Sequence, residues 1–93
     1  MSIRFTWDQE KCAQNLQRHG LDFVDAPQVF CGPTFTFQDR RFSYGEERLV
    51  TFGMLKELVV SIVHTETSDT IRTISLRRAT RNEQAIYFQQ IQN

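Results

Sequence analysis

The stretch TIRTISLRRATRNEQAIYF, residues 70–88, combines a strand pattern, a capping signal and a helix pattern. Residues 70–78 are rich in threonine and isoleucine, and their alternation is typical of a β-strand. Thr80 and Glu83 have the T-x-x-E spacing of a capping box, which predicts a helix from there to about Gln90. The stretch therefore predicts a strand that leads directly into a C-terminal helix.

Strict alternation along residues 70–78 assigns the side chains of this strand to two faces. Ile74 and Leu76 identify the face that packs on the core, with Arg72 and Arg78 at its two ends. The opposite face presents small hydroxyl groups that lead to a guanidinium, and its members are Ile71, Thr73, Ser75 and Arg77. Such a surface is unusual for solubility alone, so it is a candidate binding surface.

Four arginines lie in a ten-residue part of this stretch, although the whole chain carries no net charge. They are Arg72, Arg77, Arg78 and Arg81. No carboxylate lies between Asp69 and Glu83, while the 11 basic and 11 acidic residues of the chain balance. A neutral chain has no general attraction for nucleic acid, so RNA or DNA binding would depend on this local basic patch.

Four further strands and a polar loop precede this stretch. Alternating or apolar patterns predict the strands, whose ranges are 3–7, 34–38, 48–55 and 57–66. A tight turn near Lys56 joins the last two of them. The polar segment 39–47 is expected to be a loop.

Two helices are predicted between the first and second strands. Asp8 offers an N-cap for the first helix, and Gly20 is its expected stop. The second helix covers residues 23–30, but Pro27 would remove a hydrogen bond within it. This helix is therefore either kinked or begins only near Ala26.

The elements follow the order β-α-α-β-β-β-β-α in a single domain that spans residues 1–93. Strands that are neighbours in sequence and have short connections pair antiparallel, so we expect an antiparallel sheet with helices packed on one of its faces. The fold class is therefore α+β. No repeat, low-complexity segment or linker divides the chain.

Cys12 and Cys31 are expected to be reduced and mostly buried. The first residues, MSIRFTWDQEK, lack the apolar core of a signal peptide. The longest apolar run, LVVSIV, is far shorter than the roughly 20 residues needed to cross a bilayer. These features predict a cytoplasmic protein without membrane association, where cysteines stay reduced.

Lys11 and Asn15 lie on a polar stripe of the first helix, His19 lies near it, and Trp7 precedes the helix at the same spacing of four. The plain interpretation is a solvated helix face with a half-buried tryptophan. The functional interpretation is that Lys11 and His19 contact a phosphate or a partner carboxylate while Trp7 stacks. The pattern leaves both interpretations open.

Glu83 and Tyr87 share a face of the last helix, and Glu83 lies six residues beyond Arg77. One interpretation is that Glu83 only caps the helix and that Tyr87 is a core aromatic. The other is that Arg77 and Arg48 hold a scissile phosphate while Glu83 or Tyr87 moves protons.

Common signatures of metal and cofactor sites are missing from the sequence. It contains no C-x-x-C, no H-E-x-x-H and no phosphate-binding glycine loop, and His19 and His64 stand alone. Neither a metal nor a cofactor is predicted.

Three segments of the chain form a recognisable combined pattern. They are FTWDQEKCAQNLQRHGLDFVDAPQVF, GEERLVTFG and IRTISLRRATRNEQAIYF. Together, in this order and spacing, they resemble the BrnT family of toxins from bacterial type II toxin-antitoxin systems over nearly the whole chain. The residues on family positions are Trp7, Asp8, Lys11, Asn15, His19, Gly20, Arg48, Gly53, Arg72, Ser75, Arg77, Ala79, Glu83 and Tyr87.

The resemblance implies a RelE-like fold and an endoribonuclease activity that blocks translation and growth. It also implies a cognate antitoxin with a ribbon-helix-helix DNA-binding domain, which neutralises the toxin. The joint complex, with two copies of each protein, would repress its own operon. Operator DNA would then be contacted only through the antitoxin.

The hypothesis that follows is metal-independent RNA cleavage, in which a 2′-hydroxyl attacks the neighbouring phosphate. Arg77 and Arg48 would bind the phosphorane with a bidentate geometry that lysine cannot provide. Glu83 is the candidate base, and Tyr87 or His19 is the candidate acid. The candidate RNA-binding residues are Trp7, Lys11, Arg72 and Arg78. A glutamate beside two arginines is expected to have a lowered pKa, which makes it a weak base unless RNA changes its surroundings.

A non-catalytic protein-binding module is the alternative. The same arginines would then grip an acidic segment of a DNA-binding partner, with which the chain would act as co-repressor. Glu83→Ala separates the two hypotheses, because an enzyme would lose cleavage while keeping its partner.

Overall fold

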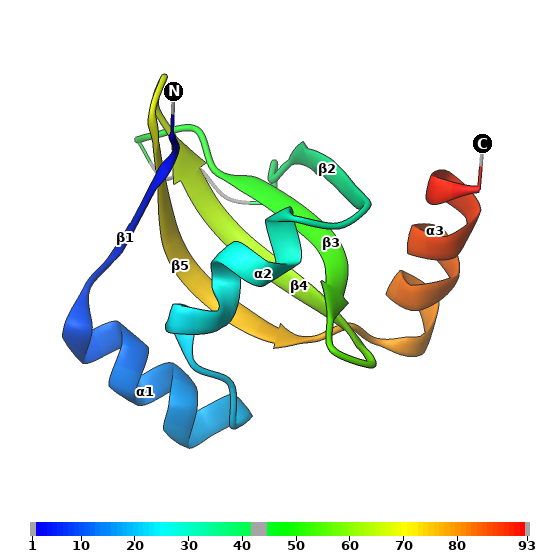
Figure 1. Ribbon diagram of the computed structural model, residues 1–93, viewed down its shortest axis with the longest axis horizontal. Helices are drawn as coiled ribbons and strands as arrows, with labels where there is room; N and C mark the ends of the chain where they lie inside the picture. The colour runs from blue at the N-terminus through cyan, green and yellow to red at the C-terminus, as the bar shows by residue number, and fades with distance from the viewer. Residues whose placement is uncertain (1, 42–44, 93) are drawn as a thin grey trace.

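The computed structural model describes residues 2–41 and 45–92 and contains a five-stranded sheet with helices around it (Figure 1). The strands are β1 (Arg4–Trp7), β2 (Thr34–Gln38), β3 (Leu49–Leu55), β4 (Leu58–Glu66) and β5 (Thr70–Arg78). The helices are α1 (Gln9–His19), the 3₁₀ turn η1 (Phe23–Asp25), α2 (Ala26–Phe30) and α3 (Arg81–Ile91). Residues 42–44, which belong to the loop predicted at 39–47, lie outside the described residues.

The strands are arranged in the order β1-β5-β4-β3-β2. The strands from β2 to β5 pair antiparallel with their neighbours in sequence, which confirms the α+β class and the predicted element order. The short strand β1 instead pairs in parallel with β5, so the sheet is mixed. The rule that neighbouring strands with short connections pair antiparallel could not place β1, because its partner β5 is far from it in the sequence.

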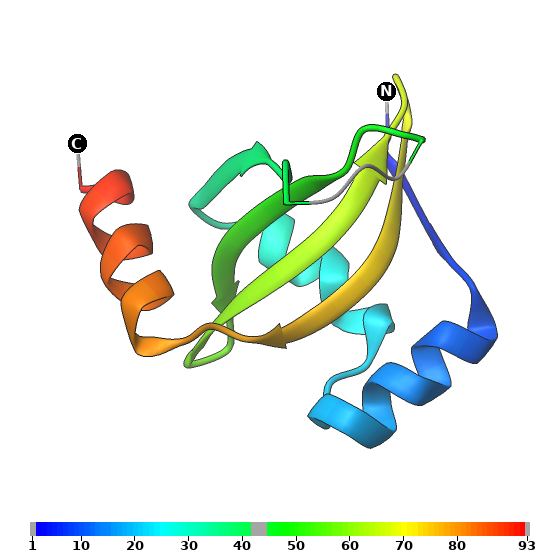
Figure 2. The ribbon, with the colours of Figure 1, turned by 180° about the vertical axis from the view of Figure 1, so that it is seen from behind.

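Helices cover both faces of the sheet, so the prediction that they pack on one face is wrong. On one side, α1, η1 and α2 enclose a core of Cys12, Phe23, Ala26, Val29, Leu55, Val60, Ile62 and Leu76. On the other side, Tyr87 of α3 packs with Val50, Phe52, Val59 and Ala79. Figure 1 shows α2 in front of the sheet, and Figure 2 shows α3 beside its β2–β3 end. The central strands are apolar at consecutive positions because both of their faces are buried.

A β-bulge between β4 and β5 changes which side chains of β5 share a face. Val63 pairs with Ser75, but the next pair is His64 with Thr73, so Ile74 is the additional residue. Thr73 therefore joins the face of Leu76 and is 2% exposed, whereas Arg72 joins the face of Ser75 and Arg77. The strict alternation predicted for this strand is wrong for this reason.

The predicted caps are present at the helix ends. Asp8 Oδ1 accepts a hydrogen bond from Lys11 N at 3.1 Å, and Gly20 ends α1 with a φ of 71°. The second helix is interrupted: a 3₁₀ turn comes first, and α2 begins at Ala26. Pro27 thus stands in the first turn, where no backbone hydrogen bond is lost.

Asn15 joins α1 to the open edge of β5. Its Nδ2 donates to Leu76 O at 2.8 Å and to Leu21 O at 2.9 Å, and its Oδ1 accepts from Leu76 N at 3.1 Å. Pairing between β1 and β5 stops at Thr73. The Asn15 amide therefore takes the place that a neighbouring strand would have beside Leu76.

His64 is fully buried in β4 and ends a chain of close polar contacts. Its Nε2 lies 2.7 Å from Thr51 Oγ1, which lies 2.7 Å from Thr36 Oγ1. The Glu66 carboxylate is 3.5 Å from Nδ1, but its side chain is 41% exposed to water, which screens its charge. Burial lowers the pKa of His64 from 6.5 to about 4, so the ring is neutral at neutral pH.

The free energy of unfolding is expected to fall as the pH is lowered from about 6.5 to about 4. In this window the unfolded chain binds a proton at His64 that the folded chain does not bind, and the full effect is about 3 kcal/mol. Chemical denaturation at neutral pH and at about pH 4 measures it. The matched variant His64→Gln should show a flatter dependence, and equal slopes for the two proteins would contradict the prediction.

Cys12 and Cys31 are both free thiols. Cys12 is buried, but Cys31 is exposed at the end of α2, which corrects the expectation that both are mostly buried. Among residues 2–41 and 45–92, no helix has the length and hydrophobicity to cross a membrane.

Candidate functional site

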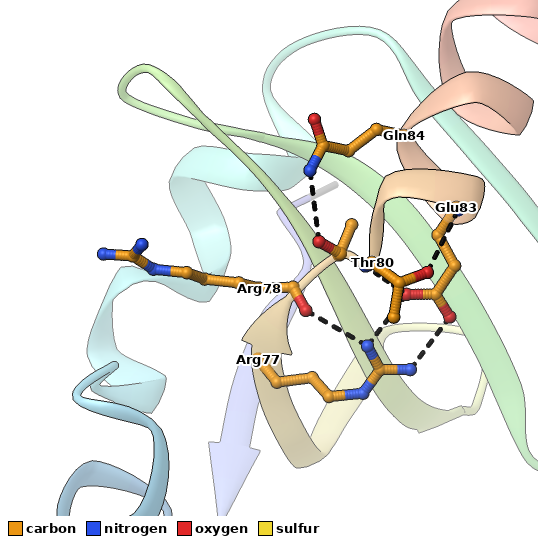
Figure 3. Close-up of polar contacts among 6 residues, drawn as sticks. Arg77, Arg78, Thr80, Glu83 and Gln84 are labelled. Atoms are coloured by element: carbon orange, nitrogen blue, oxygen red, sulfur yellow. Dashed lines mark hydrogen bonds and ion pairs between the residues drawn. The ribbon is translucent and has the colours of Figure 1, made fainter.

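Arg77 and Glu83 form a two-point ion pair where β5 leads into α3 (Figure 3). Arg77 Nη1 donates to Glu83 Oε1 at 2.8 Å, and Nη2 donates to Oε2 at 2.9 Å. Glu83 Oε1 also accepts from Thr80 N at 2.8 Å, while Thr80 Oγ1 accepts from Glu83 N at 3.2 Å. The capping box predicted from the sequence therefore also orients an arginine.

The pair fixes the charge state of both side chains. The hydrogen bonds from Arg77 hold the pKa of the Glu83 carboxyl below its usual value, and those to Glu83 raise the pKa of Arg77. Glu83 is consequently ionised at neutral pH, as expected for a glutamate beside an arginine. In this geometry it is a weak base.

A cavity of about 610 Å³ lies beside this ion pair. Its lining residues are Phe35, Phe37, Gln38, Asp39, Arg40, Arg41, Val50, Phe52, Ser61, Arg77, Asn82, Glu83 and Ile86. Strands β2 and β3 supply the aromatic walls, β5 supplies Arg77, and α3 closes one side. The cavity therefore combines apolar surface with ionised groups at its edge.

Arg41 approaches the same cavity from the segment after β2. Its Nε and Nη2 donate to the two carboxylate oxygens of Asp39 at 2.9 and 3.0 Å. The Asp39 side chain is 1% exposed, whereas that of Arg41 is 61% exposed. The positive charge of Arg41 acts against the rise in the pKa of Arg77. Each arginine is held by its own carboxylate, and both line one cavity.

Asp39 and Arg41 were not identified as site residues from the sequence. Their signal was a D-x-R spacing directly after a strand with two phenylalanines on one face. The prediction of a polar loop at residues 39–47 provides no reason to select this spacing over its neighbours.

Arg48 does not line the cavity with Arg77. Its Nε lies 3.4 Å from Glu46 Oε1, and Arg72 Nη2 lies 3.1 Å from the same oxygen. Arg72 pairs with Thr65, and Arg77 pairs with Ser61 on the same face of β4. Arg72, together with Arg48, which shares its Glu46 partner, therefore lies on the same face of the sheet as Arg77. Arg41 lines the cavity with Arg77, and the catalytic role predicted for Arg48 stays a prediction.

Lys11 and His19 come together in a separate hollow of about 210 Å³ between α1 and β5. Its lining residues are Lys11, Gln14, Asn15, Arg18, His19, Ile74 and Ser75. No described residue lines both this hollow and the cavity beside the ion pair. His19 does not line the cavity that contains Glu83.

Tyr87 is fully buried, and its hydroxyl donates to Pro33 O at 2.8 Å, which fastens the start of β2 to α3. Burial raises the pKa of Tyr87. Tyr87 does not line the cavity, and neither does Trp7, which packs against the core on the α1 side. Figure 3 shows Arg78 extending away from Arg77. The described residues contain no group of three or more histidines, cysteines or carboxylates that could hold a metal ion.

Comparisons with known proteins identify the family of this chain. The family model described as "Ribonuclease toxin, BrnT, of type II toxin-antitoxin system" matches residues 7–83. The crystal structure of the Brucella abortus ribonuclease toxin BrnT superposes with a TM-score of 0.69 at 23% sequence identity, covering 86% of this chain and 100% of that one. No curated protein sequence matches the chain. Because the family model spans most of its length, the chain belongs to the BrnT family of ribonuclease toxins of type II toxin-antitoxin systems.

Proposed function

We propose that the chain is a metal-independent endoribonuclease that cleaves at the cavity shared by Arg77 and Arg41. The observation that carries the proposal is the placement of these two guanidinium groups from different elements at one aromatic-walled cavity. Planar guanidinium groups that are already oriented can bind two phosphate oxygens each, with little reorganisation during the reaction.

The reaction would begin with attack of a ribose 2′-oxygen on the adjacent phosphorus. A bond forms between the 2′-oxygen and phosphorus, the bond to the 5′-oxygen of the next nucleotide breaks, and the products carry a 2′,3′-cyclic phosphate and a 5′-hydroxyl. Arg77 and Arg41 would stabilise the negative charge that accumulates on the phosphorane oxygens. Such stabilisation requires no metal ion.

Glu83 remains the candidate base, activated by the substrate. A phosphate bound to the remaining N–H groups of Arg77 places negative charge beside Glu83, which raises the pKa of this carboxyl. Glu83 would then accept the proton of the 2′-hydroxyl. Because neither His19 nor Tyr87 lines this cavity, water that enters it would protonate the leaving oxygen.

Three of the predicted residues, Arg48, Arg72 and Lys11, would bind RNA away from the cut. Arg48 and Arg72 lie along the sheet face of Arg77, and Lys11 lies in the hollow between α1 and β5. RNA cleavage by such a toxin would block translation and growth in the cytoplasm. A ribbon-helix-helix antitoxin would cover the cavity in a complex with two copies of each protein, which would bind operator DNA through the antitoxin.

The first test is RNA cleavage by the purified chain, separated from any partner, with EDTA present. We expect cleavage to persist and the products to carry cyclic phosphate ends. Cleavage that is abolished by EDTA and restored by a divalent cation would contradict the metal-independent mechanism.

The protein-binding alternative is supported by one observation, that Arg77 and Arg41 are both already neutralised by a carboxylate. Glu83→Gln is a sharper test than Glu83→Ala, because glutamine can still accept from Thr80 N and maintain the cap. An enzyme would lose cleavage while binding its antitoxin normally. Unchanged cleavage would contradict the role of Glu83 as base.

A further inference from the structure

From the shape and chemistry of the cavity, we infer that it binds one unpaired nucleobase, so that the substrate is single-stranded RNA. The inference rests on the proposed function and specifies its substrate. It depends on the aromatic wall, the size of the cavity and the register that connects this wall to Arg77.

Among the described residues of the aromatic wall, Phe37 has the most exposed ring and is available for stacking. Phe37 is 38% exposed, whereas Phe52 behind it is 3% exposed. The two ring centroids are 5.2 Å apart with the planes at 74°, and Phe35 and Phe37 are 5.6 Å apart. Phe37 is thus held by its neighbours while part of its surface faces the cavity, as in aromatic platforms on which bases stack.

The cavity has the size of a small-molecule site. Its volume of about 610 Å³ is roughly three times that of the hollow between α1 and β5, at about 210 Å³. Pockets for small ligands typically range from about 300 to 1,000 Å³ and combine apolar walls with a few polar groups. The side-chain amides of Gln38 and Asn82 at this cavity could bond to the edge of a base.

The sheet register connects the phosphate end of the site to its aromatic end. Arg77 pairs with Ser61, Ser61 pairs with Phe52, and Phe52 pairs with Phe35. These four residues form one row across the sheet, from β5 to β2, on the side where α3 packs. A nucleotide whose phosphate contacts Arg77 can therefore place its base over the phenylalanines.

This arrangement excludes a duplex from the same position. Bases in a duplex are stacked and paired, so none of them can enter a cavity bounded by α3 and the segment with Asp39 and Arg41. Proteins that read unpaired RNA bases commonly stack them on aromatic side chains. A single strand can present one base to the cavity while its backbone continues along the arginines.

The test measures binding of a short, labelled 2′-O-methyl RNA, which cannot be cleaved, by fluorescence anisotropy. We expect Phe37→Ala to weaken binding by about 5- to 100-fold. Phe37→Trp should bind at least as tightly as the unchanged protein, because it enlarges the stacking surface. Phe88→Ala is the matched control, since Phe88 is 43% exposed but lines a separate groove with Met54 and Arg78.

A duplex of the same sequence should bind much more weakly than the single strand. Equal affinity for both, or equal effects of Phe37→Ala and Phe88→Ala, would overturn the base site. If RNA cleavage nevertheless persisted and required Arg77, the proposed ribonuclease activity would be supported without the base site. Conversely, Phe37-dependent binding without cleavage of any RNA would refute the ribonuclease and preserve the base site.

Discussion

Replacing Arg77 by alanine is expected to lower the rate of RNA cleavage by about 100- to 1,000-fold, the range found when one preorganised donor to a transition-state oxyanion is removed. Arg77 is oriented by both oxygens of Glu83 and by Arg78 O, to which its Nη1 donates at 3.1 Å. It therefore meets the phosphate without first losing rotational freedom. Single-turnover cleavage of a defined RNA by the unchanged and variant proteins measures the effect.

Arg78→Ala is the matched control for the loss of positive charge. Arg78 is the next residue in β5, but its side chain extends away from the ion pair (Figure 3). We expect this variant to cleave at nearly the unchanged rate. Arg77→Lys keeps the charge but loses the two-point geometry, so it should recover only a small part of the activity.

Equal losses from Arg77→Ala and Arg78→Ala would contradict the special role of Arg77 and indicate a general electrostatic contribution. Folding is checked by thermal unfolding, because Arg77→Ala leaves Glu83 with only its capping contacts to Thr80. A variant that melts normally and does not cleave would assign the loss to chemistry.

The ion pair at the centre of this prediction could be anticipated because its signal is local. The T-x-x-E spacing of Thr80 and Glu83 predicts a cap, and Arg77 lies at the end of the strand directly before it. The structure brings these residues together as that spacing suggested. Arg41 could not be found in this way, because its position depends on how β2 packs on β3.

The faces of β5 could not be predicted because a bulge carries no clear local signal in this sequence. Ile74 is an ordinary strand residue, yet it is the one left out of the pairing with β4. Its insertion moves Arg72 to the face of Arg77 and Thr73 into the core. The parallel pairing of β1 with β5 was also missed, because these two strands are far apart in the sequence and no local pattern connects them.

Asn15 is a second residue whose importance depends on long-range pairing. The sequence placed it on a polar stripe of the first helix, but it is 7% exposed and bonds to a strand 61 positions away. No periodicity distinguishes such a residue from its solvated neighbours. Only the end of the β1–β5 pairing at Thr73 explains why β5 needs a side-chain partner at Leu76.

Asn15→Ala is expected to lower the free energy of unfolding by about 3 to 4 kcal/mol, because it leaves the buried N–H and C=O groups of Leu76 and the C=O of Leu21 without this partner. A domain of this size has only about 5 to 14 kcal/mol in total. Denaturant titration measures the loss. Gln14→Ala, at the exposed preceding position, is the matched control and should change stability by less than about 0.5 kcal/mol.

Asn15→Asp tests the same contacts with almost no change in shape. At neutral pH a carboxylate oxygen would face the carbonyl oxygens of Leu76 and Leu21, where the Nδ2 group now donates. We expect this variant to be as unstable as Asn15→Ala at neutral pH and to regain stability relative to the unchanged protein as the pH falls, because a protonated carboxyl can donate one hydrogen bond. Both proteins keep His64 and lose its contribution over the same pH range, so the informative quantity is the difference between their free energies of unfolding. A difference that narrows as the pH falls would establish that the amide replaces a strand at the edge of β5, and parallel slopes would contradict it.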